Sequence, residues 1–397
     1  MNVGILTYHW VSNFGANLQA LSTYKYLENH GYKPIVINWV PERLEKYYQD
    51  KVPFEQNEAH RLFKEKHFKN ITDLCREEKD IARVIDDCNI EIVIIGSDAV
   101  FSTKPFLSRI HFGKKGITVL KPCEDAVMPN PFWGNFVPYV KKRIKVVALS
   151  ASAQNSPFRK ALFPFEKQTY RDALSQFSCV TVRDIWTQRM VSFFSKGRII
   201  PNVTPDPVFG FEQNVNPGKH FYVREVLHIE KPYVLLSVSS MTTEWQLELE
   251  RLFNEQGIEV VGLPRTTVRF NSPLKYCLSF PLDPLDWYDA IKCSSGYIGE
   301  LMHPVLVSLH NSIPVYVFDT YGFKSKGTLD KATSKTYQII MKYKLLDNYY
   351  NKLISKKPPL PQLVVQSILN FDRERERKVS CAQLSEYNSA MQTILTV

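Results

Sequence analysis

The stretch GILTYHWVSNFGANLQAL, residues 4–21, joins an apolar run to a polar turn and then to a helical pattern. The run GILTY predicts a buried strand, and the spacing of apolar residues predicts a helix over 16–30 that closes at Gly31. The turn over 12–17 carries one glycine, Gly15, so it lacks the GxGxxG pattern of a dinucleotide-binding loop. A strand, turn and helix in this order are typical of the start of an α/β domain.

The same alternation continues through the first half of the chain. Several apolar runs are continuous in valine and isoleucine, as expected of parallel strands that are buried on both faces. The expected strands are 3–8, 33–39, 91–96, 144–150, 179–184 and 197–202, and the expected helices are 16–30, 79–89, 160–177 and 185–195.

The alternation restarts after a stretch rich in glycine, proline and charge. The second set has expected strands at 232–239, 258–263, 296–299 and 313–319, with helices at 242–256, 284–293, 301–311 and 334–346. The pattern predicts an α/β protein with two Rossmann-like doubly wound domains facing a cleft. We expect a first domain over 1–210, a linker over 211–230, a second domain over 231–350 and a helical tail over 351–397.

Composition narrows the classes of partner. There are 50 Lys and Arg against 40 Asp and Glu, and this net charge of +10 favours anionic partners. The charge is scattered and no nucleic-acid-binding motif is present, so we expect no nucleic acid. Seven cysteines without a CxxC pair, and no histidine pair at ligand spacing, predict no metal. No apolar run reaches the ~18 residues of a membrane span, so we expect a cytoplasmic protein, or one at the inner face of the membrane.

Polar residues follow several of the expected strands. They are Asn13, Gly15, Asn17, Asp98, Arg183, Glu300 and His303. Each has a structural explanation, because asparagine and aspartate cap helices and turns and a helix histidine is often half-buried. Ligands of open α/β sheets bind outside the carboxyl ends of strands, so the shared position of these residues indicates a binding cleft. P-loop, serine-hydrolase and zincin motifs are absent.

Seven sequence blocks stand in the order of a known family. They are GILTYHWVSNFGANLQALSTYKYLENHGY, IIGSDAVF, NPFWG, ALSASAQN, TVRD, PDPVF and SSGYIGELMHPVLVSLHNSIPVYVFD, within residues 3–319. In this order the chain resembles the polysaccharide pyruvyl transferase family. The resemblance implies a fold like that of GT-B glycosyltransferases and transfer of a pyruvyl group from phosphoenolpyruvate to two hydroxyls of one sugar. The product is a cyclic ketal on galactose or another hexose of a capsule or surface polysaccharide.

The resemblance also implies roles for individual residues. His303 is the expected proton donor, because protonation of an enol carbon needs an acid that titrates near neutrality. The other expected catalytic residues are Asp98 and Glu300; the expected donor-binding residues are Arg183, Gly15, Asn17 and Arg265; the expected acceptor-binding residues are Asn13, His9 and Trp133. Trp133 lies in a long proline-containing loop, 104–140, on the expected acceptor side. We expect no cofactor, since phosphoenolpyruvate is a substrate.

The chain departs from the family pattern beside the histidine. Leu301 stands where the family has an arginine, and Pro304 replaces the glycine that follows the histidine. We expect Arg265, Arg269 or Lys104 to supply the positive charge that this arginine provides in the family. A lipid-diphosphate-linked oligosaccharide is the expected acceptor, with peripheral contact to an anionic membrane. The alternatives are a GT-B glycosyltransferase that uses a nucleotide sugar and a non-catalytic glycan-binding relative.

Overall fold

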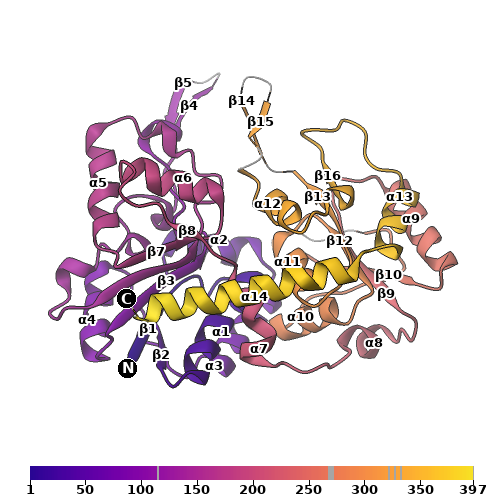
Figure 1. Cartoon of the computed structure of the whole chain (residues 1–397), viewed down its shortest axis with the longest axis horizontal. Coiled ribbons are helices and arrows are strands. Elements are labelled where there is room, and N and C mark those ends of the chain that lie inside the picture. The colour runs from indigo at the N-terminus through magenta and orange to yellow at the C-terminus, as the bar shows by residue number, and fades with distance from the viewer. Residues whose placement is uncertain (114–115, 267–271, 321, 326–327, 331–332, 397) are drawn as a thin grey trace.

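Two six-stranded sheets form the centre of the computed structural model, which describes residues 1–113, 116–266, 272–320, 322–325, 328–330 and 333–396. All strands of both sheets run parallel to their neighbours, and helices cover each sheet (Figure 1). The predicted α/β fold with two Rossmann-like doubly wound domains is confirmed. Among the described residues, no helix combines the length and apolar character needed to cross a bilayer.

The first sheet has the strand order β2-β1-β3-β6-β7-β8. Its strands are β1 (Asn2–Leu6), β2 (Lys33–Val36), β3 (Ile92–Asp98), β6 (Lys145–Ala151), β7 (Cys179–Val182) and β8 (Asn202–Val203). Its helices are α1 (Phe14–Asn29), α2 (Glu42–Lys51), α3 (Phe54–His67), α4 (Glu78–Asp87), α5 (Pro164–Ser175) and α6 (Ile185–Phe194). The expected strand over 197–202 is wrong except at its last residue, because Ile200 is exposed and only Ile199 of its apolar residues packs against the core.

The second sheet has the order β11-β10-β9-β12-β13-β16. Its strands are β9 (Tyr233–Ser237), β10 (Glu259–Gly262), β11 (Tyr276–Cys277), β12 (Gly296–Gly299), β13 (Val315–Asp319) and β16 (Tyr349–Asn351). Its helices are α9 (Thr243–Glu255), α10 (Pro284–Lys292), α11 (Met302–His310), α12 (Lys335–Lys342) and α13 (Pro361–Leu369). The central strands β9, β12 and β13 are buried along their whole length, as their apolar runs predict.

Each domain extends one antiparallel hairpin from the same side of the molecule (Figure 1). In the first domain, strands β4 (Ile110–Gly113) and β5 (Gly116–Val119) follow the 3-10 helix η1 (Phe106–Arg109) within the loop 104–140. In the second domain the hairpin consists of β14 (Phe323–Ser325) and β15 (Thr328–Asp330).

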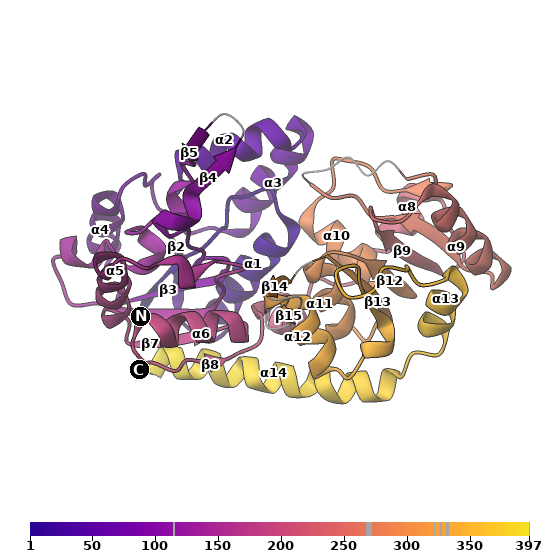
Figure 2. The ribbon, with the colours of Figure 1, turned by 90° about the horizontal axis from the view of Figure 1, so that it is seen from above.

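The chain crosses between the domains twice. The first crossing contains η6 (Pro207–Gly210), α7 (Phe211–Val215) and α8 (Tyr222–Leu227), and α7 packs against α1. The second is α14 (Arg373–Thr396), a long helix that runs beneath both domains and ends near the N-terminus (Figures 1 and 2). One continuous core includes buried residues of both domains and of α14. The two domains are therefore packed against each other.

Candidate functional site

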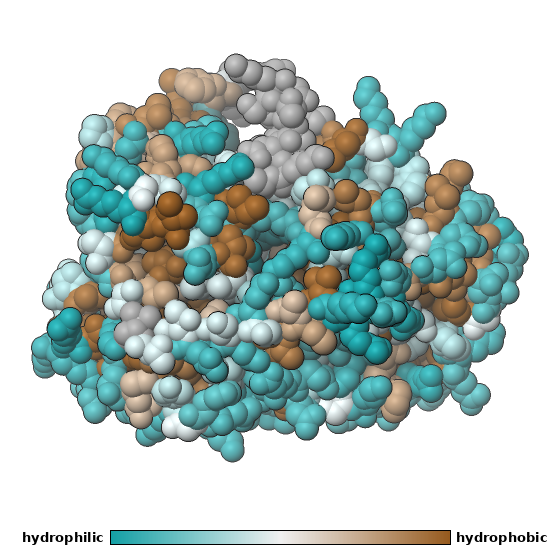
Figure 3. Space-filling view, in the orientation of Figure 1, coloured by the Kyte–Doolittle hydropathy of each residue, from teal (hydrophilic) through white to brown (hydrophobic). Residues whose placement is uncertain are grey.

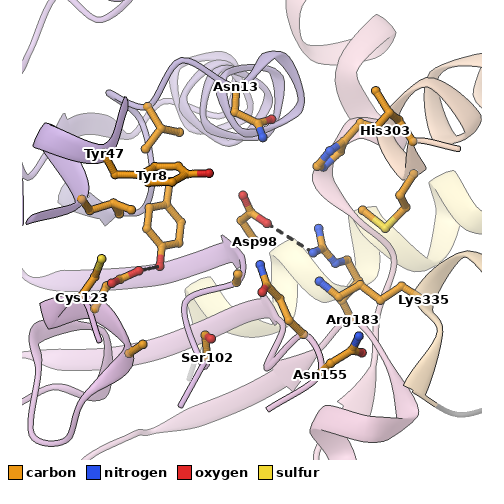
Figure 4. Close-up of a pocket in the computed structure, with 18 of the residues that line it drawn as sticks. Tyr8, Asn13, Tyr47, Asp98, Ser102, Cys123, Asn155, Arg183, His303 and Lys335 are labelled. Carbon is orange, nitrogen blue, oxygen red and sulfur yellow. Dashed lines mark hydrogen bonds and ion pairs between the residues drawn. The ribbon is translucent and has the colours of Figure 1, made fainter. Parts of the chain in front are cut away.

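A cavity of about 660 Å³ lies between the domains, beyond the carboxyl ends of both sheets (Figure 4). The N-terminal ends of three helices reach it, because Asn13 of the α1 cap, His303 of α11 and Lys335 of α12 all line its wall. Helix N-termini carry unpaired N–H groups and a positive partial charge. The wall where these helices meet therefore suits a small anion.

Arg183 is the most buried cation of the cavity. It follows β7, its side chain is 6% exposed, and its guanidinium nitrogens lie 2.5 Å from Asp206 Oδ2 and 3.4 Å from Asp98 Oδ1. Burial alone would lower the pKa of Arg183, but the two carboxylates raise it, so the guanidinium stays charged. The two ion pairs fix its plane at the cavity wall beside Asp98 (Figure 4).

His303 comes from the other domain and faces the same carboxylate. Its Nε2 lies 4.0 Å from Asp206 Oδ2, is buried and has no hydrogen-bond partner among the described residues. Burial lowers the pKa of His303, and the positive charge of Arg183 lowers it further. Asp206 and Asp98 oppose this shift only in part, so the ring is neutral at neutral pH. Burial alone would raise the pKa of Asp206, but Arg183 and His303 bring it below its usual range. The carboxylate is therefore placed to stabilise an imidazolium.

A close contact with His303 explains why position 15, in the turn before α1, is a glycine. A Cβ at position 15 would lie 2.1 Å from two atoms of the His303 ring, which no real side chain tolerates. The imidazole thus packs directly on the backbone at the start of α1. The single glycine is a contact between the domains rather than part of a phosphate loop.

Replacing Gly15 by alanine is expected to reduce turnover by about 10²-fold, because the methyl group displaces the imidazole of His303. Steady-state rates and thermal melting of the variant test this. Gly113→Ala is the matched control, since its added methyl would meet only a backbone oxygen at 4.0 Å. Full turnover in Gly15→Ala would show that the position of the ring does not matter.

Lys335 is a cation that the sequence did not indicate. It is the first residue of α12 and extends beside Arg183 (Figure 4). Burial and the neighbouring Arg183 lower the pKa of Lys335 to about 8. Within the part of the chain that the structure describes, its amine makes no hydrogen bond or ion pair. Since Arg183 is shared by two carboxylates, Lys335 supplies the unneutralised positive charge of this wall.

The three cations expected to replace the arginine absent at Leu301 differ in position. Arg265 does not line the cavity, because its guanidinium binds Glu300 and donates to Ser237 O at 3.1 Å. Lys104 lines the cavity on the first domain. Arg269 lies outside the described residues.

Glu300 lines the cavity but is saturated with donors. It accepts hydrogen bonds from Ser239 Oγ at 3.0 Å, from the backbone N–H of Ser240 at 2.9 Å and from Arg265. Burial alone would raise the pKa of Glu300, yet these donors keep it below the usual value. With its lone pairs engaged, the carboxylate organises the loop after β12.

Asp98 is held in an unusual backbone conformation at the end of β3. Its φ is +73°, a region that costs a non-glycine residue free energy and that recurs at functional sites. The backbone before it is equally constrained, since a Cβ on Gly96, at φ +118°, would lie 2.4 Å from Leu149 O. The strained turn directs the Asp98 carboxylate toward Arg183 and into the cavity.

The first-domain side of the cavity holds a second carboxylate, Asp125. Tyr8 donates a hydrogen bond from its hydroxyl to Asp125 Oδ2 at 2.6 Å, while Oδ1 is buried without a partner among the described residues. Burial raises the pKa of Asp125. Tyr47 and Tyr48 line the same side. Aromatic rings beside an acceptor oxygen are suited to a sugar.

Three expected binding residues lie away from the cavity, which corrects the sequence analysis. His9 is fully buried between Thr7 O and Asn38 Oδ1, at 3.1 and 3.0 Å, and burial lowers its pKa to about 4. Asn17 is also fully buried, and its amide donates to the carbonyls of residues 9 and 11. Trp133 is a core residue that stacks on Phe101 at 4.5 Å. None of the three lines the cavity.

The residues missed from the sequence left weak signals. Asp206 stands in the PDPVF block and caps η6, so a strand-end search that included β8 would have found it. Lys335 follows Ser334, a standard helix N-cap residue. Tyr8 and Asp125 carry no local signal, because they are 117 residues apart in the sequence and meet only in the folded protein.

Solved structures of other proteins have a similar architecture. UDP-GlcNAc 2-epimerase from Neisseria meningitidis, bound to UDP-GlcNAc, aligns with 100% of this chain and 99% of its own at 10% identity and a TM-score of 0.55. MnaA of S. aureus, solved with UDP, aligns with 99% of this chain and 94% of its own at 12% identity and a TM-score of 0.51. These likenesses show the fold alone.

Sequence comparison is more specific. A search of curated proteins returned no match. The family model described as polysaccharide pyruvyl transferase matches residues 13–321, well over half of the chain. The protein therefore belongs to the polysaccharide pyruvyl transferase family.

Proposed function

We propose that this protein transfers a pyruvyl group from phosphoenolpyruvate to two hydroxyls of one hexose, forming a cyclic ketal and releasing phosphate. The acceptor is a lipid-diphosphate-linked saccharide of surface polysaccharide synthesis. The observation that carries the proposal is the unpartnered, buried imidazole Nε2 of His303, which lies 4.0 Å from Asp206 where three helix N-termini converge.

The donor fits the wall of the cavity where the two domains meet. Phosphoenolpyruvate carries a phosphate and a carboxylate, and both anions bind guanidinium, ammonium and helix N–H groups. Arg183 and Lys335 provide the first two groups, and the start of α11 provides the third. Binding of this anion would also favour the charged form of His303, since nearby negative charge raises the pKa of an imidazole.

The transfer balances with His303 as the proton carrier. The imidazolium of His303 protonates the methylene carbon of the enol, which leaves an oxocarbenium-like carbon at C2. One sugar hydroxyl attacks C2 and its proton returns to the histidine. The second hydroxyl, deprotonated by Asp125, then displaces the phosphate, which takes this second proton from Asp125 as it leaves. Asp206 stabilises the imidazolium while it is charged.

The acceptor fits the first-domain side. Asp98 presents its carboxylate next to Arg183, and Asp125 accepts a hydrogen bond from Tyr8, which lies across the cavity from His303 (Figure 4). A raised pKa makes Asp125 a stronger base than an ordinary aspartate, which suits a group that orients and deprotonates a hydroxyl. Tyr47 and Tyr48 flank this position.

The proposal is tested by incubating the protein with phosphoenolpyruvate and galactose-terminated acceptors. The expected product gains the mass of pyruvate less water, and one phosphate is released for each ketal. UDP-sugars serve as the competing donors, because the alternative of a nucleotide-sugar glycosyltransferase predicts that they, and not phosphoenolpyruvate, raise the melting temperature. Absence of ketal with every hexose acceptor, together with no phosphoenolpyruvate binding, would refute the proposal.

Lys335→Gln is expected to raise the KM for phosphoenolpyruvate by about 10- to 100-fold, the equivalent of one lost charge-assisted hydrogen bond. Initial rates against donor concentration measure the effect. Lys335→Arg keeps the charge and is expected to recover part of the affinity. An unchanged KM in Lys335→Gln would remove this residue from the donor site.

Asp125→Asn is expected to lower kcat by about 10²-fold with little change in the KM for phosphoenolpyruvate, because the lost group acts on the acceptor. Tyr8→Phe is the matched variant, since it removes the hydrogen bond to Asp125 and keeps the carboxylate. We expect a smaller loss there. A donor-specific defect in Asp125→Asn would contradict the assignment.

A further inference from the structure

The β4–β5 hairpin has one apolar face that nothing in the described structure covers. In its ladder Ile110 pairs with Val119 and Phe112 with Ile117, so these four side chains share one face. Phe112 is 82% exposed and Ile117 is 69% exposed. His111 and Thr118 pair on the opposite face. The hairpin is therefore amphipathic, although it stands out from the domain rather than packing on it (Figure 1).

The apolar surface continues from the hairpin onto the domain. At its base, the ring of Phe106 lies 6.1 Å from that of Phe163, which stacks on the exposed Phe165 at 5.5 Å. Figure 3 shows apolar side chains gathered on this part of the first domain, around α5 and α6. We call Phe106, Phe112, Ile117, Phe163 and Phe165 the apolar ridge. A patch of this kind on an exposed surface marks an interaction site.

Basic side chains flank the apolar ridge. The Arg109 guanidinium lies over the Phe106 ring at 5.3 Å, and Lys121 is exposed just after β5. Arg159 and Lys160 are exposed on the 3-10 helix η5 (Phe158–Lys160), which packs against η1. Among acids of this region, Glu166 accepts a hydrogen bond from the backbone of Phe106 at 2.8 Å. The surroundings of the ridge are thus positively charged.

The ridge is continuous with the cavity wall. Lys104 precedes η1, and Cys123 and Asp125 follow β5, and all three line the cavity. One segment of chain therefore carries both the hairpin part of the ridge and residues of the proposed acceptor side of the cavity.

We infer that the apolar ridge inserts into the surface of an anionic lipid bilayer and presents the cavity to lipid-linked saccharide. This inference rests on the proposed function for the identity of the acceptor, but not for the binding itself. Apolar and aromatic side chains ringed by cations match the boundary between acyl chains and acidic headgroups. A second copy of the chain fits less well, because a narrow hairpin offers little of the ~800 Å² per partner that a stable interface buries.

The test is flotation of the full-length protein with vesicles of phosphatidylcholine alone or of equal parts phosphatidylcholine and phosphatidylglycerol. We expect binding to the anionic vesicles that weakens as salt rises, and about tenfold weaker binding in Phe112→Ser/Ile117→Ser. Phe54→Ser is the matched control, because Phe54 is 78% exposed on α3 and is not part of the ridge. It should bind as the unmodified protein does.

Three results would overturn the inference. They are failure of the unmodified protein to bind anionic vesicles, equal binding by the double variant, and a dimer that the double variant abolishes without any vesicle binding. Turnover with a water-soluble acceptor is measured in parallel and is expected to be unchanged in the double variant. Vesicle binding without turnover of any acceptor would refute the proposed function, while the inference that the ridge binds a bilayer would still hold.

Discussion

Replacing His303 by glutamine is expected to lower kcat by at least about 10²-fold, because an amide cannot supply the proton that the imidazolium gives to the donor. The folded state should survive, since the ring makes no hydrogen bond through its buried Nε2 among the described residues. Calorimetry is therefore expected to show phosphoenolpyruvate still bound. Turnover at the rate of the unmodified protein would remove His303 from the proton transfer.

The pH profile gives an independent check on the same residue. The acid form is the protonated imidazole, and burial lowers the pKa of His303 below 6.5 in the free protein. We therefore expect kcat/KM to be highest at acidic pH and to fall as pH rises through that lowered pKa. The decline of kcat should occur at a higher pH than the decline of kcat/KM, because a bound anion stabilises the imidazolium. A kcat/KM that rises through this range would contradict the assignment.

Replacing Arg183 by methionine is expected to cost about 3–5 kcal/mol of folding free energy and most of the donor affinity. The substitution leaves the buried Asp206 without its ion-pair partner at 2.5 Å, and an uncompensated buried charge is strongly destabilising. Chemical denaturation and donor titration measure the two effects. Arg183→Lys should restore charge but not the paired geometry, because an ammonium cannot span Asp206 and Asp98 as a guanidinium does.

A double variant separates stability from binding. In Arg183→Met/Asp206→Asn a neutral amide replaces the buried carboxylate, so a large part of the lost folding free energy should return. Donor affinity should stay low, because the guanidinium is still missing. Recovery of donor affinity in the double variant would show that Arg183 acts only through the fold.

The fold was predictable where burial follows the chain. Runs of valine and isoleucine gave the central strands of both sheets, because strands buried on both faces need apolar side chains at every position. Helix α2 was missed, since none of its residues is fully buried and its apolar side is limited to Leu44, Tyr47 and Tyr48. The run at 197–202 failed for the opposite reason, because an apolar residue of it, Ile200, is exposed.

The site was predictable only in part, because a sequence pattern reports position but not direction. The strand-end rule placed Asp98, Arg183 and His303 at one edge, and the structure brings their side chains to one cavity. The same rule selected Asn17, which is fully buried instead. Lys335 reaches the cavity only through the packing of α12 against the first domain, a contact that no local pattern encodes.

The 3-10 helix η6 ties the chemistry to the relative motion of the two domains. It lies on the first crossing of the chain, and α14 packs against it on the return crossing. Its cap, Asp206, binds Arg183 of the first domain and faces His303 of the second. A rotation about these crossings that widened the cavity would also draw the imidazole away from its carboxylate. Opening the cavity would therefore also remove the support that Asp206 gives to a charged histidine.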